Sequence, residues 1–255
     1  MQNLITNKRI NFKKNYDYLS FCIGIFLLPS AVTISIIFLL FSSIINTLKN
    51  EEPYFKDKWN LPFFVGGVLL IISCLVHTFF NQRLTEYNLN PSLSWIGLAN
   101  WVPFFWFFWG FKSYLNSQRK RRLCCSILIS GTFPVIISGF GQYLLNWHGP
   151  MTTLYGLIIW YQRPLEDLDG MTGLFNNPNY LGTWMNLVWP FCLALIMNSS
   201  NKINNRLASY FFILSISTSI ILTNSRAAWI GLIIGTSLML RKKAYKYNLY
   251  FCIFS

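Results

Sequence analysis

The sequence predicts an all-α protein, a polytopic bundle of transmembrane helices, on three observations. Of its 255 residues, 53% are hydrophobic and only 11% are charged, whereas soluble domains carry about 25% charged residues. Several apolar runs reach the length of about 20 residues that crosses the hydrocarbon core of a bilayer. Basic residues gather in short stretches between these runs, as they do in cytoplasmic loops. We therefore expect a single transmembrane domain over residues 1–255 with about seven to eight membrane segments.

The first apolar block covers residues 19–45 and is interrupted by Pro29-Ser30. Basic residues flank it on both sides, at 8–14 and at 49–58, and one crossing cannot place both flanks inside. Two short helices that turn at Pro29-Ser30 would place both flanks inside, and proline favours such a break. A single span with an external N-terminus is the alternative, and we prefer the hairpin.

Six further spans follow from the alternation of apolar and basic stretches. We predict them at about 61–80, 95–115, 123–145, 174–197, 208–223 and 227–240. The basic connections 116–122, 198–207 and 241–248 are predicted to lie inside, which leaves 81–94 and 146–173 outside. Residues 154–161 of the second outer loop are apolar but too few to span, and we expect an interfacial helix there.

The net charge of +13 does not indicate a nucleic-acid partner, because the basic residues are confined to connections between apolar runs. Six cysteines lie in apolar segments, without a C-x-x-C or a Cys/His ligand spacing. The expected partner is therefore the lipid bilayer. We expect no nucleic acid and no metal.

A polar segment, Asn176-Asn177-Pro178-Asn179, lies at the start of the predicted span 174–197. Pro178 biases the preceding residue away from helix, and asparagine is a good helix N-cap. A helix N-terminus with free amides is also a site for an anion or a hydroxyl group. Three asparagines in four positions exceed the need of one cap, so both interpretations remain open.

A second polar segment, Thr223-Asn224-Ser225-Arg226, separates two apolar runs. A continuous helix over 208–240 would be about 50 Å long at ~1.5 Å per residue, which exceeds a core of about 30 Å. The chain therefore turns here, and Arg226 lies near the outer surface. It either snorkels to the lipid headgroups or binds a phosphate with its bidentate guanidinium.

A second outer arginine, Arg163, precedes the acidic residues Glu166 and Asp167. It either clamps a phosphate or forms a surface ion pair with one of these carboxylates.

The two polar segments resemble motifs of the O-antigen ligase and polymerase family, especially its cyanobacterial-type members. The motifs are G-x-F-x-N-P-N-x-x-G and, some 40 residues later, T-N-S-R-x-A-W-x-G. The matching residues are Gly173, Phe175, Asn177, Pro178, Asn179, Gly182, Ser225, Arg226, Ala228, Trp229 and Gly231. The resemblance covers about 170–240, which we take as the core of the family motif.

The resemblance implies a multi-pass protein of the bacterial inner (plasma) membrane that transfers or polymerises glycan. The donor is a polyprenyl diphosphate-linked saccharide at the outer membrane face, and the chemistry uses no metal and no cofactor. Family arginines on that face hold the diphosphate, which matches Arg226. The substrate-binding residues that we predict are Arg226, Ser225, Asn177, Asn179 and Arg163.

The chain departs from the family in ways that leave the enzyme assignment open. The family histidine that activates the acceptor would lie beyond Ser255, and an arginine often found before G-x-F is absent. Family members are longer, so the resemblance implies a missing C-terminal half or a second chain, and no catalytic residue is assigned. Without that half, the chain would be inactive.

The alternative is a transport protein or accessory for a bicarbonate-type solute. The few ionisable groups inside the spans give it little support.

Overall fold

The computed structural model describes residues 16–49, 53–80, 92–165, 170–197 and 203–254. The chain forms two compact units, one of residues 1–21 and 40–120 and the other of residues 22–39 and 121–255. The described residues are mostly helical. Residues 81–91 of the predicted outer loop, residues 198–202 of the predicted connection 198–207, and residues 166–169, which hold three acidic side chains, lie outside the described residues.

The first apolar block forms two helices rather than one. Helix α1 (Tyr16–Leu27) and helix α2 (Val32–Lys49) are separated at the predicted break, Pro29-Ser30. The hydroxyl of Ser35 on α2 donates a hydrogen bond of 2.7 Å to the carbonyl oxygen of Gly24 on α1. A side chain at Gly24 would collide with Leu39, so the glycine allows the two helices to pack closely.

The first unit contains residues 16–21 and 40–49 of these two helices, together with helix α3 (Asn60–Phe80) and helix α5 (Ser92–Gly110), which pack against each other. The ring of Phe63 lies 5.5 Å from that of Phe105 and 4.5 Å from that of Phe108, between centroids. Two short 3₁₀ helices, η2 (Tyr54–Lys56) and η3 (Lys112–Leu115), flank this pair. The predicted span 95–115 therefore ends at Gly110.

A buried polar cluster joins the start of α1 to the end of α2 within the first unit. The carboxylate of Asp17 accepts a hydrogen bond of 2.9 Å from the Tyr114 hydroxyl and forms an ion pair of 2.9 Å with Lys49. Tyr114 is 3% exposed. The first and last turns of the hairpin are therefore at the same end of this unit, as the basic flanks on both sides predicted.

The predicted span 123–145 is interrupted near its centre in the second unit. Helix α6 (Gln118–Gly131) ends before Thr132, and helix α7 (Phe133–Leu145) begins after it. Pro134 lies in the first turn of α7, where its missing N–H costs no helical hydrogen bond. Gly131 packs against the backbone of Phe26, which leaves no room for a side chain at this break.

The interfacial helix predicted for residues 154–161 is wrong. Strands β1 (Met151–Thr153) and β2 (Ile158–Trp160) form an antiparallel hairpin in which Met151 faces Trp160. The β-branched and aromatic residues of β2 favour an extended chain. The connection contains Tyr155 and Gly156 with positive φ, which suits a tight hairpin turn.

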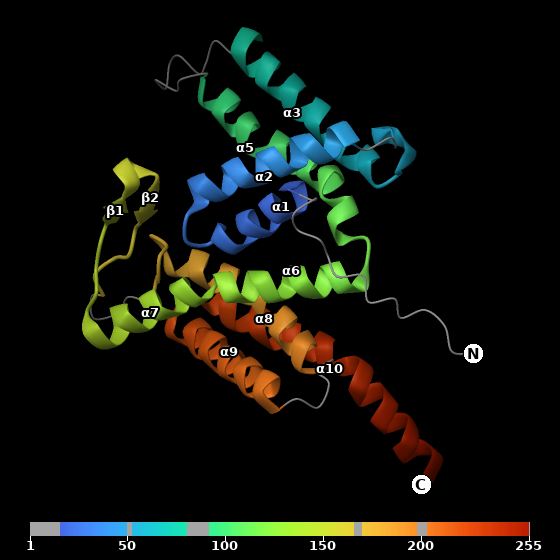
Figure 1. Cartoon of the computed structure of the whole chain (residues 1–255), viewed down its shortest axis with the longest axis vertical. Helices are drawn as coiled ribbons and strands as arrows, with labels where there is room; N and C mark the ends of the chain where they lie inside the picture. The colour runs from blue at the N-terminus through green and yellow to red at the C-terminus, as the bar shows by residue number, and fades with distance from the viewer. Residues whose placement is uncertain (1–15, 50–52, 81–91, 166–169, 198–202, 255) are drawn as a thin grey trace. The chain divides into compact units, whose positions relative to one another are not determined.

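Three helices complete the second unit and lie side by side (Figure 1): α8 (Pro178–Met197), α9 (Ile203–Leu222) and α10 (Arg226–Phe254). Helix α8 begins four residues later than the predicted span 174–197. The predicted turn between 208–223 and 227–240 is confirmed, with Asn224 at φ 52°. The predicted connection 241–248 is helical instead, because residues 241–254 contain neither glycine nor proline to end α10.

Among the described residues, four helical stretches are long and apolar enough to cross a membrane: Val32–Lys49, Asn60–Phe79, Gln118–Leu145 and Pro178–Met197. Only 6% of the second stretch is buried inside the protein, so its apolar side chains are left to face lipid. The shorter apolar helices are Tyr16–Leu27, Leu207–Leu222 and Arg226–Leu240. These helices support a multi-pass membrane protein, and the count of seven to eight segments stays a prediction.

Candidate functional site

The two polar segments meet at the start of two neighbouring helices of the second unit. Helix α8 begins at Pro178, and helix α10 begins at Arg226. The hydroxyl of Ser225 donates a hydrogen bond of 2.7 Å to Oδ1 of Asn179, which lies 46 residues earlier in the chain. The structure therefore brings four of the five predicted site residues, Asn177, Asn179, Ser225 and Arg226, to one end of the α8–α10 pair.

Asn177 and Ser225 cap these two helices. Oδ1 of Asn177 accepts a hydrogen bond of 2.8 Å from the backbone N–H of Asn179, and Oγ of Ser225 accepts one of 3.3 Å from the N–H of Ala228. A cap oxygen satisfies one of the backbone donors that a helix leaves unpaired at its N-terminus. Asn179 is exposed, and its Nδ2 group donates to no atom within the described ranges. The side-chain oxygens of Asn177 and Asn179 are thus both occupied, whereas the Nδ2 donor of Asn179 is left available.

Arg226 is the first residue of α10 and is exposed. Its guanidinium makes no ion pair or hydrogen bond with any residue that the structure describes. The positive end of the helix dipole disfavours a cation at this position by about 0.3–1 kcal/mol. None of the described contacts therefore gives the Arg226 side chain a role in the fold. Its position suits the binding of an anion.

Arg163, the fifth predicted site residue, is held in place through its backbone. Its N–H donates to Oγ1 of Thr172 at 3.4 Å, and the N–H of neighbouring Met171 donates to the carbonyl of Leu222 at 2.8 Å. Residues 161–165 and 170–174 are thereby tied to the α9–α10 turn that holds Ser225. The Arg163 side chain is exposed, and its predicted acidic partners, 166–167, lie outside the described residues.

The central support of this segment is Gln142 of α7, which sequence reasoning missed. Its Nε2 donates to the carbonyl of Arg163 at 2.6 Å and to Oγ1 of Thr172 at 3.0 Å. Its Oε1 accepts from the N–H groups of Thr172 at 2.9 Å and of Gly173 at 3.1 Å. Gln142 is 1% exposed. A glutamine inside the apolar run 123–145 was the available signal, because such an amide is costly there unless it is paired.

Two glycines of the motifs are explained by packing between α8 and α10. A Cβ atom at Gly182 would lie 2.6 Å from Cβ of Ala228, and one at Gly231 would lie 2.7 Å from Nδ2 of Asn186. That Nδ2 group donates to the carbonyl of Ala228 at 3.0 Å. Small residues at such contacts let two helix backbones approach closely. The glycines therefore keep the two helix N-termini adjacent.

The site as a whole is built from amide, hydroxyl and guanidinium groups at two helix N-termini. No three His, Cys, Asp or Glu side chains converge to hold a metal ion in the described part of the chain. N–H donors and positive charge of this kind bind phosphates and other anions. Comparison of the chain with protein-family models, with curated proteins and with solved structures gave no match.

Proposed function

We propose that this protein binds a polyprenyl diphosphate-linked saccharide and takes part in its transfer or polymerisation, as O-antigen ligases and polymerases do. The observation that carries the proposal is the hydrogen bond between Ser225 and Asn179. It joins the two segments on which the family resemblance rests. The proposal also places the site at the outer face of a bacterial inner membrane, in line with the basic connections predicted to lie inside.

The diphosphate is the part of this ligand that the described residues suit best. Helix N-termini carry about half a positive charge each, and those of α8 and α10 are adjacent. Arg226 adds a guanidinium that can bind a phosphate through two N–H donors. The two negative charges of the diphosphate would offset the unfavourable placement of that cation at the start of α10.

The remaining site residues have different roles in this proposal. The exposed Nδ2 of Asn179 donates to a phosphate or sugar oxygen. Asn177 and Ser225 act as positioning residues, because their oxygens hold the two helix starts in place. Arg163 supplies a second exposed cation on a segment fastened to the same turn. We assign binding to this set and assign no general base to it.

The test is direct binding of undecaprenyl diphosphate to the purified protein in lipid nanodiscs. Arg226→Ala removes charge-assisted hydrogen bonds worth about 1.5–3 kcal/mol, so we expect roughly ten- to hundredfold weaker binding. Arg119→Ala, at the start of α6 in a predicted inner connection, is the matched control and should leave the affinity unchanged. Equal affinities of wild type and Arg226→Ala would refute the proposed site.

A further inference from the structure

The turn of the β1–β2 hairpin presents a cluster of apolar side chains outward. Leu154, Tyr155 and Leu157 are all exposed, and Tyr155 completely so. Leu154 and Tyr155 also adopt the left-handed backbone conformation, at φ 51° and 55°, which residues other than glycine rarely adopt. The fold thus accepts backbone strain in a turn whose apolar side chains gain no burial. Exposed apolar clusters of this kind mark surfaces that bind a membrane or another protein.

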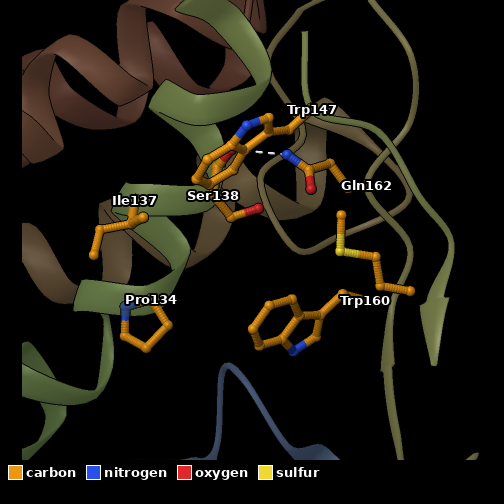
Figure 2. Close-up of a pocket in the computed structure, with 7 residues that line it drawn as sticks. Pro134, Ile137, Ser138, Trp147, Trp160 and Gln162 are labelled. Atoms are coloured by element: carbon orange, nitrogen blue, oxygen red, sulfur yellow. Dashed lines mark hydrogen bonds between the residues drawn. The ribbon is translucent and has the colours of Figure 1, made fainter. Parts of the chain in front are cut away.

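The base of the hairpin is fixed, and this determines the direction of its tip. Nε2 of Gln162 donates to the carbonyl of Ser138 on α7 at 2.8 Å, as Figure 2 shows. Nε1 of Trp160 donates to the carbonyl of Ser30, between α1 and α2, at 2.8 Å. The hairpin leaves the end of α7 sideways instead of continuing its axis (Figure 1). Because α7 lies in the predicted span 123–145, a sideways hairpin runs along the membrane surface.

The composition of this segment suits lipid. Residues 147–162 contain no Asp, Glu, Lys or Arg. Their exposed aromatic side chains include Trp147 and Tyr161, and tryptophan and tyrosine are enriched where proteins meet lipid headgroups. Leu144 and Leu145 in the last turn of α7 are also exposed. The apolar surface of the hairpin therefore continues an apolar helix surface that a membrane would cover.

A cavity of about 360 Å³ with mostly apolar walls separates the hairpin from α7, and Trp147 and Trp160 lie on opposite sides of it in Figure 2. Water finds few hydrogen-bond partners in such a space, whereas lipid hydrocarbon can fill it. The backbone limits how deep the hairpin lies. A two-stranded sheet has open edges, and open edges do not occur in the hydrocarbon core. The strands therefore suit the headgroup layer, and only the side chains of the turn reach the acyl chains.

We propose that Leu154, Tyr155 and Leu157 insert into the membrane at the predicted outer face, at the boundary between lipid headgroups and acyl chains. The partner of this surface is lipid. The N–H of Tyr161 donates to the carbonyl of Leu174 at 3.1 Å, so an inserted tip also holds the following segment at the membrane surface. A helix was predicted to occupy this layer, and the hairpin reaches it through its turn instead. The inference does not depend on the proposed function.

The experiment attaches the fluorophore NBD at position 155, through Tyr155→Cys, in the full chain in lipid nanodiscs. Two quenchers are compared: a nitroxide carried by the lipid just below its headgroup, and iodide in the water. Labelled wild type gives the background from the six native cysteines. Asn176→Cys, at the exposed polar segment before α8, is the matched control. We expect the lipid nitroxide to quench roughly twofold more at position 155 than at position 176, and iodide to show the opposite order, because interfacial segments lie about 5–10 Å into this boundary.

Leu154→Asp combined with Leu157→Asp should withdraw the tip, because a carboxylate is costly among acyl chains. Both side chains are exposed, so the changes remove no packing from the core. The label at position 155 should then lose its lipid quenching and gain quenching by iodide. Retained lipid quenching would mean that the label itself holds the tip in lipid, and this would overturn the inference. Without the charges, equal iodide quenching at positions 155 and 176 would also overturn it, and so would protection of position 155 from both quenchers, which a protein partner or a second copy of the chain would give.

Discussion

Replacement of Gln142 tests whether one buried side chain holds the outer segment in place. Gln142→Leu keeps a side chain of similar length but removes four hydrogen bonds. The backbone N–H groups of Thr172 and Gly173 and the carbonyl of Arg163 then lose their partner. Thr172 is 2% exposed, so water does not readily replace the lost amide.

The magnitude follows from the groups that are left unpaired. Each buried backbone donor without a partner costs about 1–3 kcal/mol, so two of them give roughly 2–6 kcal/mol. Total stabilities of domains are about 5–15 kcal/mol. The segment can relieve this cost by detaching from α7 while the helices stay packed, because local opening requires less free energy than global unfolding. We therefore expect residues 163–165 and 170–173 to detach from α7 while the helices remain folded.

Amide hydrogen exchange followed by mass spectrometry measures this opening. A loss of 2–6 kcal/mol predicts that exchange at Thr172 and Gly173 accelerates roughly thirtyfold or more. Gln142→Glu should show a smaller effect, because a carboxyl buried at this position stays protonated and so keeps both an acceptor for the two N–H groups and a donor for the Arg163 carbonyl. Gln118→Leu, at the exposed start of α6, should change nothing in this peptide. Unchanged exchange in Gln142→Leu would refute the reasoning.

Two further predictions concern packing within each unit. Gly182→Val should separate α8 from α10, because the new Cβ atom would collide with Ala228. Gly235→Val is the control, because a side chain at Gly235 meets open space. We expect Gly182→Val to unfold at a lower temperature than Gly235→Val. A similar effect of both variants would contradict this account. Tyr114→Phe should destabilise the protein by about 1–3 kcal/mol through loss of the bond to Asp17. Burial, with the Asp17 carboxylate adding to it, raises the pKa of Tyr114. The hydrogen bond between Tyr114 and Asp17 should therefore stabilise the wild type fully at pH values below the ordinary tyrosine pKa of about 10. This stabilisation should be lost as the pH rises through the raised pKa of folded Tyr114. Thermal unfolding from neutral to alkaline pH should then show the wild type and Tyr114→Phe curves converging.

Length, charge and turn residues were sufficient to predict much of the fold. The break at Pro29-Ser30 follows from a residue that cannot continue a helix, and the turn at 223–225 follows from a length that exceeds a bilayer. The same rules failed at 241–248, where basic residues were taken for a connection. Charge determines on which side of a membrane a segment lies, but it does not end a helix, and this stretch contains no residue that does.

The candidate site was predictable only as far as it lies in short sequence segments. Neighbouring residues indicated an asparagine cap before Pro178, whereas Ser225 was predicted to lie in a turn and its capping role was missed. The hydrogen bond between Ser225 and Asn179 depends on the packing of α8 against α10. No local pattern in a single sequence predicts that packing. Gln142 and Gln162 bond with backbone groups 21 to 31 residues away, and part of the β-hairpin was predicted to be a helix.

Most residues of the two motifs have a structural task that would account for them without any ligand. Asn177 and Ser225 cap helices, and Gly182 permits a close helix contact. A resemblance carried by such residues is therefore evidence for a shared arrangement of α8 and α10 before it is evidence for a shared activity. Arg226 differs, because no described contact uses it and the helix dipole opposes its charge at that position. Binding measurements on Arg226 consequently bear on function in a way that substitutions of the capping residues cannot, since a lost cap would weaken binding and folding together.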